Sequence, residues 1–295
     1  MGSGSWSRDS YASYSSATKS GVTLDSLGKL TGSGVSSNQD IYKQRQIHAD
    51  LFPKNIMREC CDTEEHPNTI PVILALDVTG SMGSAAVEVA KSLNVIMTKL
   101  YSEIADVEFC IMGIGDLYCD HAPIQMSQFE SDVRIAEHLD KVYFEFGGGA
   151  NNYESYTAAW YMGLRHTKLD CWKRGKKGII VTLGDETLNP YLQKDKIKEF
   201  VGDDLQSDVN TKNLFELASD KFDIYHINVT HNHYYLFDDI PKSFKDVIGE
   251  NNYYEANLNN VADVIAEIII SATNNNNDCD NTVINNTTAT DGISW

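Results

Sequence analysis

The stretch IPVILALDVTGSMG, residues 70–83, decides the fold of this 295-residue chain. Its first seven residues, 70–76, are all apolar and rich in β-branched side chains. A continuous apolar run of this length is typical of a parallel strand that is buried on both faces. Apolar residues then recur at helical spacing through residues 84–101. The stretch therefore predicts a strand, a polar turn and a helix in succession.

Strand and helix signals continue to alternate over residues 70–273. This alternation predicts an α/β fold with a doubly wound, mostly parallel central sheet and helices on both faces. Residues 1–69 are expected to form a flexible arm or a small cap, and residues 274–295 a disordered, Asn-rich tail. Besides the first strand and helix, the expected strands are 107–114, 142–146, 177–183 and 222–229, and the expected helices are 131–141, 154–168, 211–221 and 259–272.

Polar residues at the strand ends are the first candidates for a site, because ligands of such sheets bind at the carboxyl ends of the strands. Asp77, Thr79 and Ser81 follow the first strand, and Asp185 follows the strand at 177–183. One carboxylate and two hydroxyls that alternate along a turn are able to converge on one point. Hard oxygen ligands suit Mg²⁺, with Mn²⁺ or Ca²⁺ as alternatives, and do not suit zinc.

This pattern, Asp77-x-Thr79-x-Ser81, resembles the D-x-[ST]-x-S element of von Willebrand factor A (vWA) domains. In that family the element forms the metal-ion-dependent adhesion site (MIDAS). The resemblance extends over residues 70–273 and points to an intracellular, Rossmann-like vWA domain. It implies that the three side chains bind the metal directly or through water, and that Asp185 is the later aspartate of the site.

The middle element of the site departs from the family pattern. After the glycine pair the family usually has Thr, or Asp in some intracellular relatives, whereas this chain has Ala150 after Gly147–Gly149. The side-chain oxygen of Asn151 or of Asn152 is expected to replace the missing ligand.

The resemblance also implies a binding device and no catalytic residues. A metal held largely by neutral hydroxyls and water keeps much of its charge and accepts a carboxylate from a partner protein. We therefore expect a Mg²⁺-dependent protein–protein interaction module whose partner offers an Asp or Glu. The residues expected to contact the partner surround the metal ligands: Gly80, Met82, Asp116, Glu154 and Glu186.

The chain is strongly acidic, with 24 Lys and Arg against 42 Asp and Glu and a formal net charge of −18. Residues 70–273 hold 17 of the basic and 31 of the acidic side chains, so the charge belongs to the predicted domain. This balance argues against binding nucleic acid or anionic membranes. It attracts a divalent cation and repels an acidic partner at long range. The partner's carboxylate is therefore expected on a neutral or basic surface.

The lack of a recognisable targeting signal and the spacing of the cysteines favour a cytoplasmic protein. No stretch approaches the ~20 apolar residues of a membrane span, and the polar N-terminus does not read as a secretory signal. The six cysteines follow no zinc-binding spacing and are expected to be reduced thiols.

Simpler interpretations stand beside these assignments. The turn from Asp77 to Ser81 has the composition of a helix N-cap, and Glu154 suits the first turn of a helix. Asp116, after a Gly at the end of the second strand, is either a residue of the binding face or a loop carboxylate. The asparagines after Ala150 also suit a capping turn.

Two other functions stay open. One is a metal-dependent phosphohydrolase that uses Asp77 and Asp185, with Asp116 as the candidate base. The chain has neither a phosphate-binding G-x-x-x-x-G-K-[ST] loop nor a G-x-S-x-G nucleophile elbow. The other is a structural subunit of a larger assembly, with the N-terminal arm and the tail as tethers.

Overall fold

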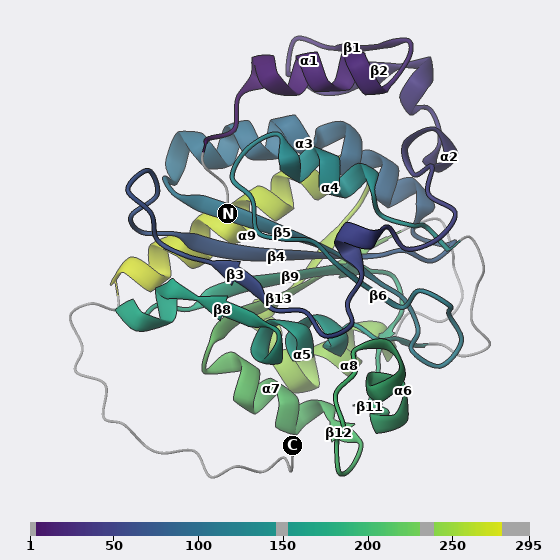
Figure 1. Cartoon of the computed structure of the whole chain (residues 1–295), viewed down its shortest axis with the longest axis vertical. Coiled ribbons are helices and arrows are strands. Elements are labelled where there is room, and N and C mark those ends of the chain that lie inside the picture. The colour runs from purple at the N-terminus through teal and green to yellow at the C-terminus, as the bar shows by residue number, and fades with distance from the viewer. Residues whose placement is uncertain (1–3, 146–152, 231–238, 279–295) are drawn as a thin grey trace.

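The computed structural model describes residues 4–145, 153–230 and 239–278. Its main feature is a six-stranded sheet in the order β14-β13-β9-β4-β5-β6, in which all neighbours are parallel except β5 and β6. Helices cover both faces of this sheet (Figure 1), so the predicted fold class is confirmed. The strands are β4 (Ile70–Asp77), β5 (Val107–Ile114), β6 (Ile124–Met126), β9 (Gly178–Gly184), β13 (Phe222–Val229) and β14 (Tyr253–Ala256).

Strand β4 lies in the middle of the sheet, between β5 and β9. Val72 and Leu74 belong to the core on one face of the sheet, and Ile73 and Ala75 to the core on the other. Because helices cover both faces, the side chains on both sides of the strand are buried, and apolar residues are favoured at every position. This explains the continuous apolar run at 70–76 and places the end of β4 at the centre of the sheet's carboxyl edge.

The helices form one layer on each face. In Figure 1 the layer with α3 lies above the sheet and the layer with α5 lies below it. The first layer contains α3 (Gly83–Glu103), α4 (Arg134–Asp140) and α9 (Val261–Asp278), and the second α5 (Thr157–Arg165), α6 (Lys194–Phe200), α7 (Thr211–Ser219) and α8 (Asp239–Ile248). Among the described residues, none of these helices combines the length and apolar composition that crossing a bilayer requires.

The N-terminal segment packs over α3. It contains α1 (Arg8–Thr18), a hairpin of β1 (Val22–Leu24) and β2 (Leu30–Gly32), and α2 (Asn38–Ile41), coloured purple in Figure 1. Three of its buried side chains donate hydrogen bonds to α3: Trp6 Nε1 to Asn94 Oδ1 (3.0 Å), Tyr11 Oη to the Ala90 carbonyl (3.3 Å) and Tyr42 Oη to the Ala86 carbonyl (2.9 Å). These hydrogen bonds hold the described part of the segment against α3.

Two predicted elements differ from the structure. Residues 142–145 are not in a strand, because the N–H and carbonyl of Tyr143 pair with the side-chain amide of Gln125 in β6 and not with a neighbouring backbone; residue 146 lies outside the described residues. The helix predicted at 154–168 starts only at Thr157, in α5. The residues before and after it form short parallel pairings: β7 (Tyr153–Glu154) with β10 (Thr187–Leu188), and β8 (Thr167–Leu169) with β3 (Arg58–Cys60).

Helix α9 continues into the segment predicted as a tail and ends at Asp278. Asn276 holds this last turn, because its side-chain amide donates to Asp223 Oδ2 (2.8 Å) and its carbonyl accepts from Lys176 Nζ (2.8 Å). The rest of the predicted tail, 279–295, lies outside the described residues. The remaining elements are β11 (Tyr191–Leu192), β12 (Val209–Asn210) and the 3-10 turns η1 (Ser33–Val35), η2 (Ala49–Leu51), η3 (Asp170–Arg174) and η4 (Glu250–Asn252).

Candidate metal site

Asp77 is the last residue of β4, and its carboxylate is fully buried. Oδ1 accepts hydrogen bonds from the Thr79 N–H (2.9 Å) and the Thr79 hydroxyl (2.6 Å). Oδ2 accepts a hydrogen bond from the Tyr156 hydroxyl (2.9 Å). The Asp-x-Thr spacing thus produces an Asx-type turn that fixes the carboxylate and one candidate hydroxyl beside each other.

Ser81 and Asp185 connect the ends of β4 and β9. The Ser81 hydroxyl donates to Asp185 Oδ1 (2.9 Å), although the residues are 104 positions apart in the sequence. Burial, and then the negative charge of Asp185, raise the pKa of Asp77. The two carboxylates therefore lie close enough to repel each other. The structure brings together Asp77, Thr79, Ser81 and Asp185, the residues that sequence reasoning selected from these two strand ends.

Tyr156 is a member of the site that sequence reasoning missed. Besides donating to Asp77, its hydroxyl accepts a hydrogen bond from the Glu186 N–H (3.3 Å), and its ring packs edge-on against His226. A Cβ at Gly184 would overlap the Tyr156 hydroxyl, so this glycine is what allows the tyrosine to reach the strand end. The glycine directly before Asp185 was the one available signal for such a close approach.

Glu154 is a buried carboxyl group beside the site. The sequence suggested a position in the first turn of a helix, but Glu154 lies in β7, before that helix begins. Only 5% of the residue is exposed. Its Oε2 has no hydrogen-bond partner among the described residues. Burial, followed by the charge of Asp77, raises the pKa of Glu154. A buried acid oxygen without a partner is costly, and a cation nearby would remove this cost.

The residues present therefore fit a divalent cation. Asp77, Asp185 and Glu154 supply carboxyl oxygens that a bound cation would keep ionised, and Thr79 and Ser81 supply hydroxyl oxygens, which is the ligand chemistry of Mg²⁺. In the part of the chain that the structure describes, no three His, Cys, Asp or Glu side chains come together as metal ligands. Any metal here thus depends on the hydroxyls. Asn151 and Asn152, the expected further ligands, lie outside the described residues.

The residues predicted to contact a partner differ in exposure. Gly80 is exposed and Glu186 is half-buried. Asp116 is buried, and its Oδ1 accepts a hydrogen bond from the Tyr118 N–H (3.0 Å). The prediction for Met82 is wrong, because only 1% of this residue is exposed and its side chain packs in the core beneath the turn.

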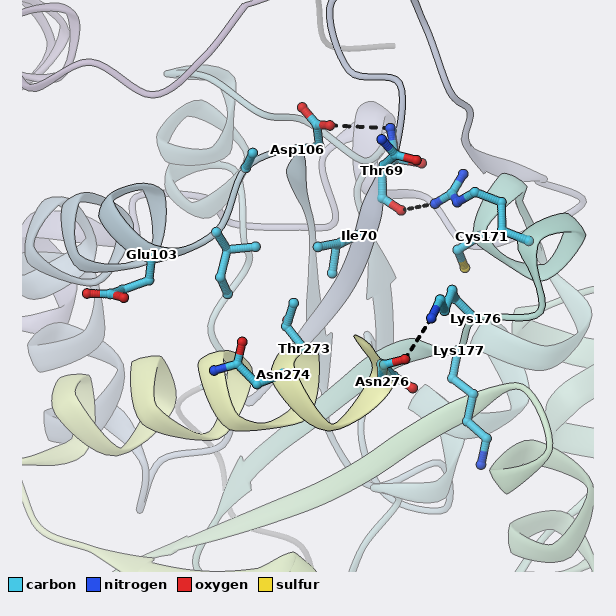
Figure 2. A pocket seen from close by; sticks show the side chains of 14 residues that line it. Thr69, Ile70, Glu103, Asp106, Cys171, Lys176, Lys177, Thr273, Asn274 and Asn276 are labelled. Atoms are coloured by element: carbon cyan, nitrogen blue, oxygen red, sulfur yellow. Dashed lines mark hydrogen bonds between the residues drawn. The ribbon is translucent and has the colours of Figure 1, made fainter. Parts of the chain in front are cut away.

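A cavity of about 570 Å³ lies at the other end of the sheet, where Ile70 begins β4 and Thr273 faces it from α9 (Figure 2). The basic side chains in its wall are already paired. Arg174 donates to the Thr69 carbonyl (2.7 Å), and Lys176 donates to the Asn276 carbonyl (2.8 Å). This cavity is separate from the strand-end site and contributes no residue to it.

No protein-family model and no curated protein matches the sequence. Among solved structures, the pilus adhesin SpaC from Lactobacillus rhamnosus GG, in its open conformation, is 13% identical, with a TM-score of 0.46. The alignment covers 74% of this chain and 31% of SpaC, so this chain spans about a third of that protein.

Two shorter chains are similar along nearly their whole length. The vWF domain of the type V pili tip protein Mfa5 from Porphyromonas gingivalis is 11% identical, with a TM-score of 0.47 over 76% of this chain and 99% of that domain. The conserved hypothetical protein BatB from Bacteroides thetaiotaomicron is 14% identical, with a TM-score of 0.40 over 70% of this chain and 99% of BatB.

Proposed function

We propose that this chain is a Mg²⁺-dependent protein-interaction module of the vWA type. In this proposal Asp77, Thr79 and Ser81 hold the metal, and Asp185 contacts it through water. Asn151 or Asn152 completes the protein's ligand set. The observation that carries the proposal is the convergence of Asp77, Thr79, Ser81 and Asp185 at the adjoining ends of β4 and β9.

The exposed side of the site determines what it binds. Ser81 and Gly80 are exposed, whereas Asp77 and Thr79 are buried beneath them. A bound Mg²⁺ would supply a positively charged coordination position for a carboxylate. The protein's residues hold the ion from below, and a partner Asp or Glu approaches from the exposed side. The cytoplasmic location favoured by the sequence is part of the same proposal.

Metal binding is tested by thermal unfolding and calorimetry of the full chain with MgCl₂, MnCl₂ or CaCl₂. We expect Mg²⁺ to raise the unfolding temperature of the wild type. Ser81→Ala, which alters an exposed hydroxyl, and Asp77→Asn, which keeps the shape of the side chain, are expected to abolish this shift. Ser84→Ala, an exposed serine three positions further on, is the matched control and should keep it. Equal shifts in all four proteins would mean that the ion binds elsewhere on the acidic surface.

Partner binding is tested by affinity capture in Mg²⁺ and in EDTA, with wild type and Asp77→Asn side by side. A partner retained equally by both proteins and in EDTA contradicts the proposed mode of binding. A phosphatase and nucleotidase screen with the same proteins separates binding from hydrolysis. Turnover in the wild type that is lost in Asp77→Asn would favour the phosphohydrolase.

A further inference from the structure

A second pocket, of about 240 Å³, adjoins the candidate metal site. Its rim carries three tyrosines whose rings reach solvent: Tyr118 (65% exposed), Tyr153 (44%) and Tyr191 (46%). These are three of the six large hydrophobic residues that are exposed in the described parts of the chain. The three tyrosines come from separate segments, so the fold has gathered them at one place.

The walls of the tyrosine pocket are held in position by hydrogen bonds. Ser155 Oγ accepts from the Leu117 N–H (3.0 Å), which ties the segment before Tyr118 to the segment after Tyr153. Asn189 Nδ2 donates to Thr157 Oγ1 (2.6 Å) and to the Tyr191 carbonyl (3.1 Å), which ties the third segment to the start of α5. The pocket is therefore preformed, and a ligand that enters it orders little of the backbone.

The charge around the pocket is negative. Asp116 lines it, and the described residues that line it include no Lys or Arg. Asp120 lies beside it, because its Oδ2 accepts a hydrogen bond from the Asp116 N–H (2.7 Å), and Glu154 lies between the lining residues Tyr153 and Ser155. A side chain suited to this pocket has a positive charge for the acids and a flat face for the tyrosine rings. The planar guanidinium of arginine has both properties, whereas a lysine ammonium has only the charge.

We propose that the tyrosine pocket binds an arginine side chain of the partner protein, stacked against the tyrosine rings and paired with Asp116. Ser155 of the pocket directly precedes Tyr156, whose hydroxyl donates to Asp77 Oδ2 at 2.9 Å. The arginine therefore binds next to the metal site. The arginine pocket does not depend on the proposed function. Only the further step, that the same partner also places a carboxylate on the metal, rests on the proposed function.

The test uses the full chain with ¹³C-labelled tyrosine, observed by NMR during titration with Ac-Arg-NH₂, Ac-Lys-NH₂ and Ac-Leu-NH₂. We expect Ac-Arg-NH₂ to shift the ring signals of the three pocket tyrosines and to bind more tightly than the other two. Tyr118→Ser and Tyr191→Ser are each expected to weaken binding about two- to five-fold, the contribution of one exposed cation–π contact. Tyr118→Phe should keep it, because the ring remains.

Phe52→Ser is the matched control, since it removes an exposed ring (49%) outside the pocket. Equal binding of the leucine and arginine probes, or unchanged binding in the Tyr→Ser variants, overturns the inference. All titrations are repeated in EDTA and with Asp77→Asn. Arginine binding that persists there, in a protein without a Mg²⁺ response, supports the pocket even if the metal site fails. A normal Mg²⁺ response without arginine binding overturns the pocket alone.

Discussion

Replacing Tyr156 with phenylalanine tests how the candidate site is held together. The change deletes one hydroxyl, which donates to Asp77 Oδ2 at 2.9 Å and accepts from the Glu186 N–H at 3.3 Å. A hydrogen bond to a charged group contributes about 1.5–3 kcal/mol, and an ordinary one about 1 kcal/mol. Asp77 is fully buried, so water does not replace the lost donor. We expect Tyr156→Phe to lower the free energy of unfolding of the metal-free protein by about 2–4 kcal/mol.

The assay is urea unfolding followed by circular dichroism, at pH 8 in EDTA. Asp77→Asn and the double variant complete a double-mutant cycle, and direct contact predicts a coupling energy of about 1–2 kcal/mol. Tyr118→Phe is the control, because its ring is 65% exposed, and it should change stability by less than about 0.5 kcal/mol. A loss of stability no larger than that of the control, or no coupling to Asp77→Asn, refutes the role of the hydroxyl in holding the carboxylate.

Three further predictions concern neighbouring contacts. Folding raises the pKa of Glu154, so the folded protein keeps a proton that the unfolded chain releases above the ordinary pKa of 4.5, and stability falls as pH rises. Glu154→Gln should therefore stabilise the metal-free protein more at pH 8 than at pH 5 in urea unfolding. Gly184→Ala, whose Cβ would overlap the Tyr156 hydroxyl, should cost about 1–3 kcal/mol, measured by thermal unfolding in EDTA. Asn94→Ala removes the acceptor of the Trp6 indole and should cost about 1–3 kcal/mol, with faster proteolysis of the N-terminal cap.

The elements that sequence reasoning located correctly are those whose signal is local. The strands expected at 107–114 and 222–229 have these bounds in the structure. Residues 107–114 form a nearly continuous apolar run, as a strand buried on both faces requires. The turn after β4 was equally readable, since the Asp77 carboxylate bonds to Thr79 only two residues away. The predicted position of Asp185 followed from the end of its strand.

The elements that were missed depend on contacts between distant segments. Tyr156 reaches Asp77 across 79 positions, and nothing in its own neighbourhood marks it as part of a site. The edge strand β6 has only three residues, too few for a periodic signal. The cap was obscured by its Ser- and Tyr-rich composition, although α3 itself offered a clue. Ala86 and Ala90, which accept the cap's tyrosine hydroxyls, belong to a helix that is apolar on more than one face.

The two proposed sites together resolve a conflict in the electrostatics of this protein. An acidic domain repels a partner that approaches with a carboxylate, yet a carboxylate is what the metal at Asp77 and Asp185 would accept. A partner that presents an arginine beside its acid is neutral over the contact, and the arginine meets the negative charge around Asp116 while the acid meets the metal. The candidate metal ligands and the tyrosine pocket are linked through Ser155 and Tyr156, because Ser155 lines the pocket and the Tyr156 hydroxyl donates to Asp77. Recognition would then require both charges at the right spacing, so a partner with the acid alone binds weakly, and added salt weakens docking.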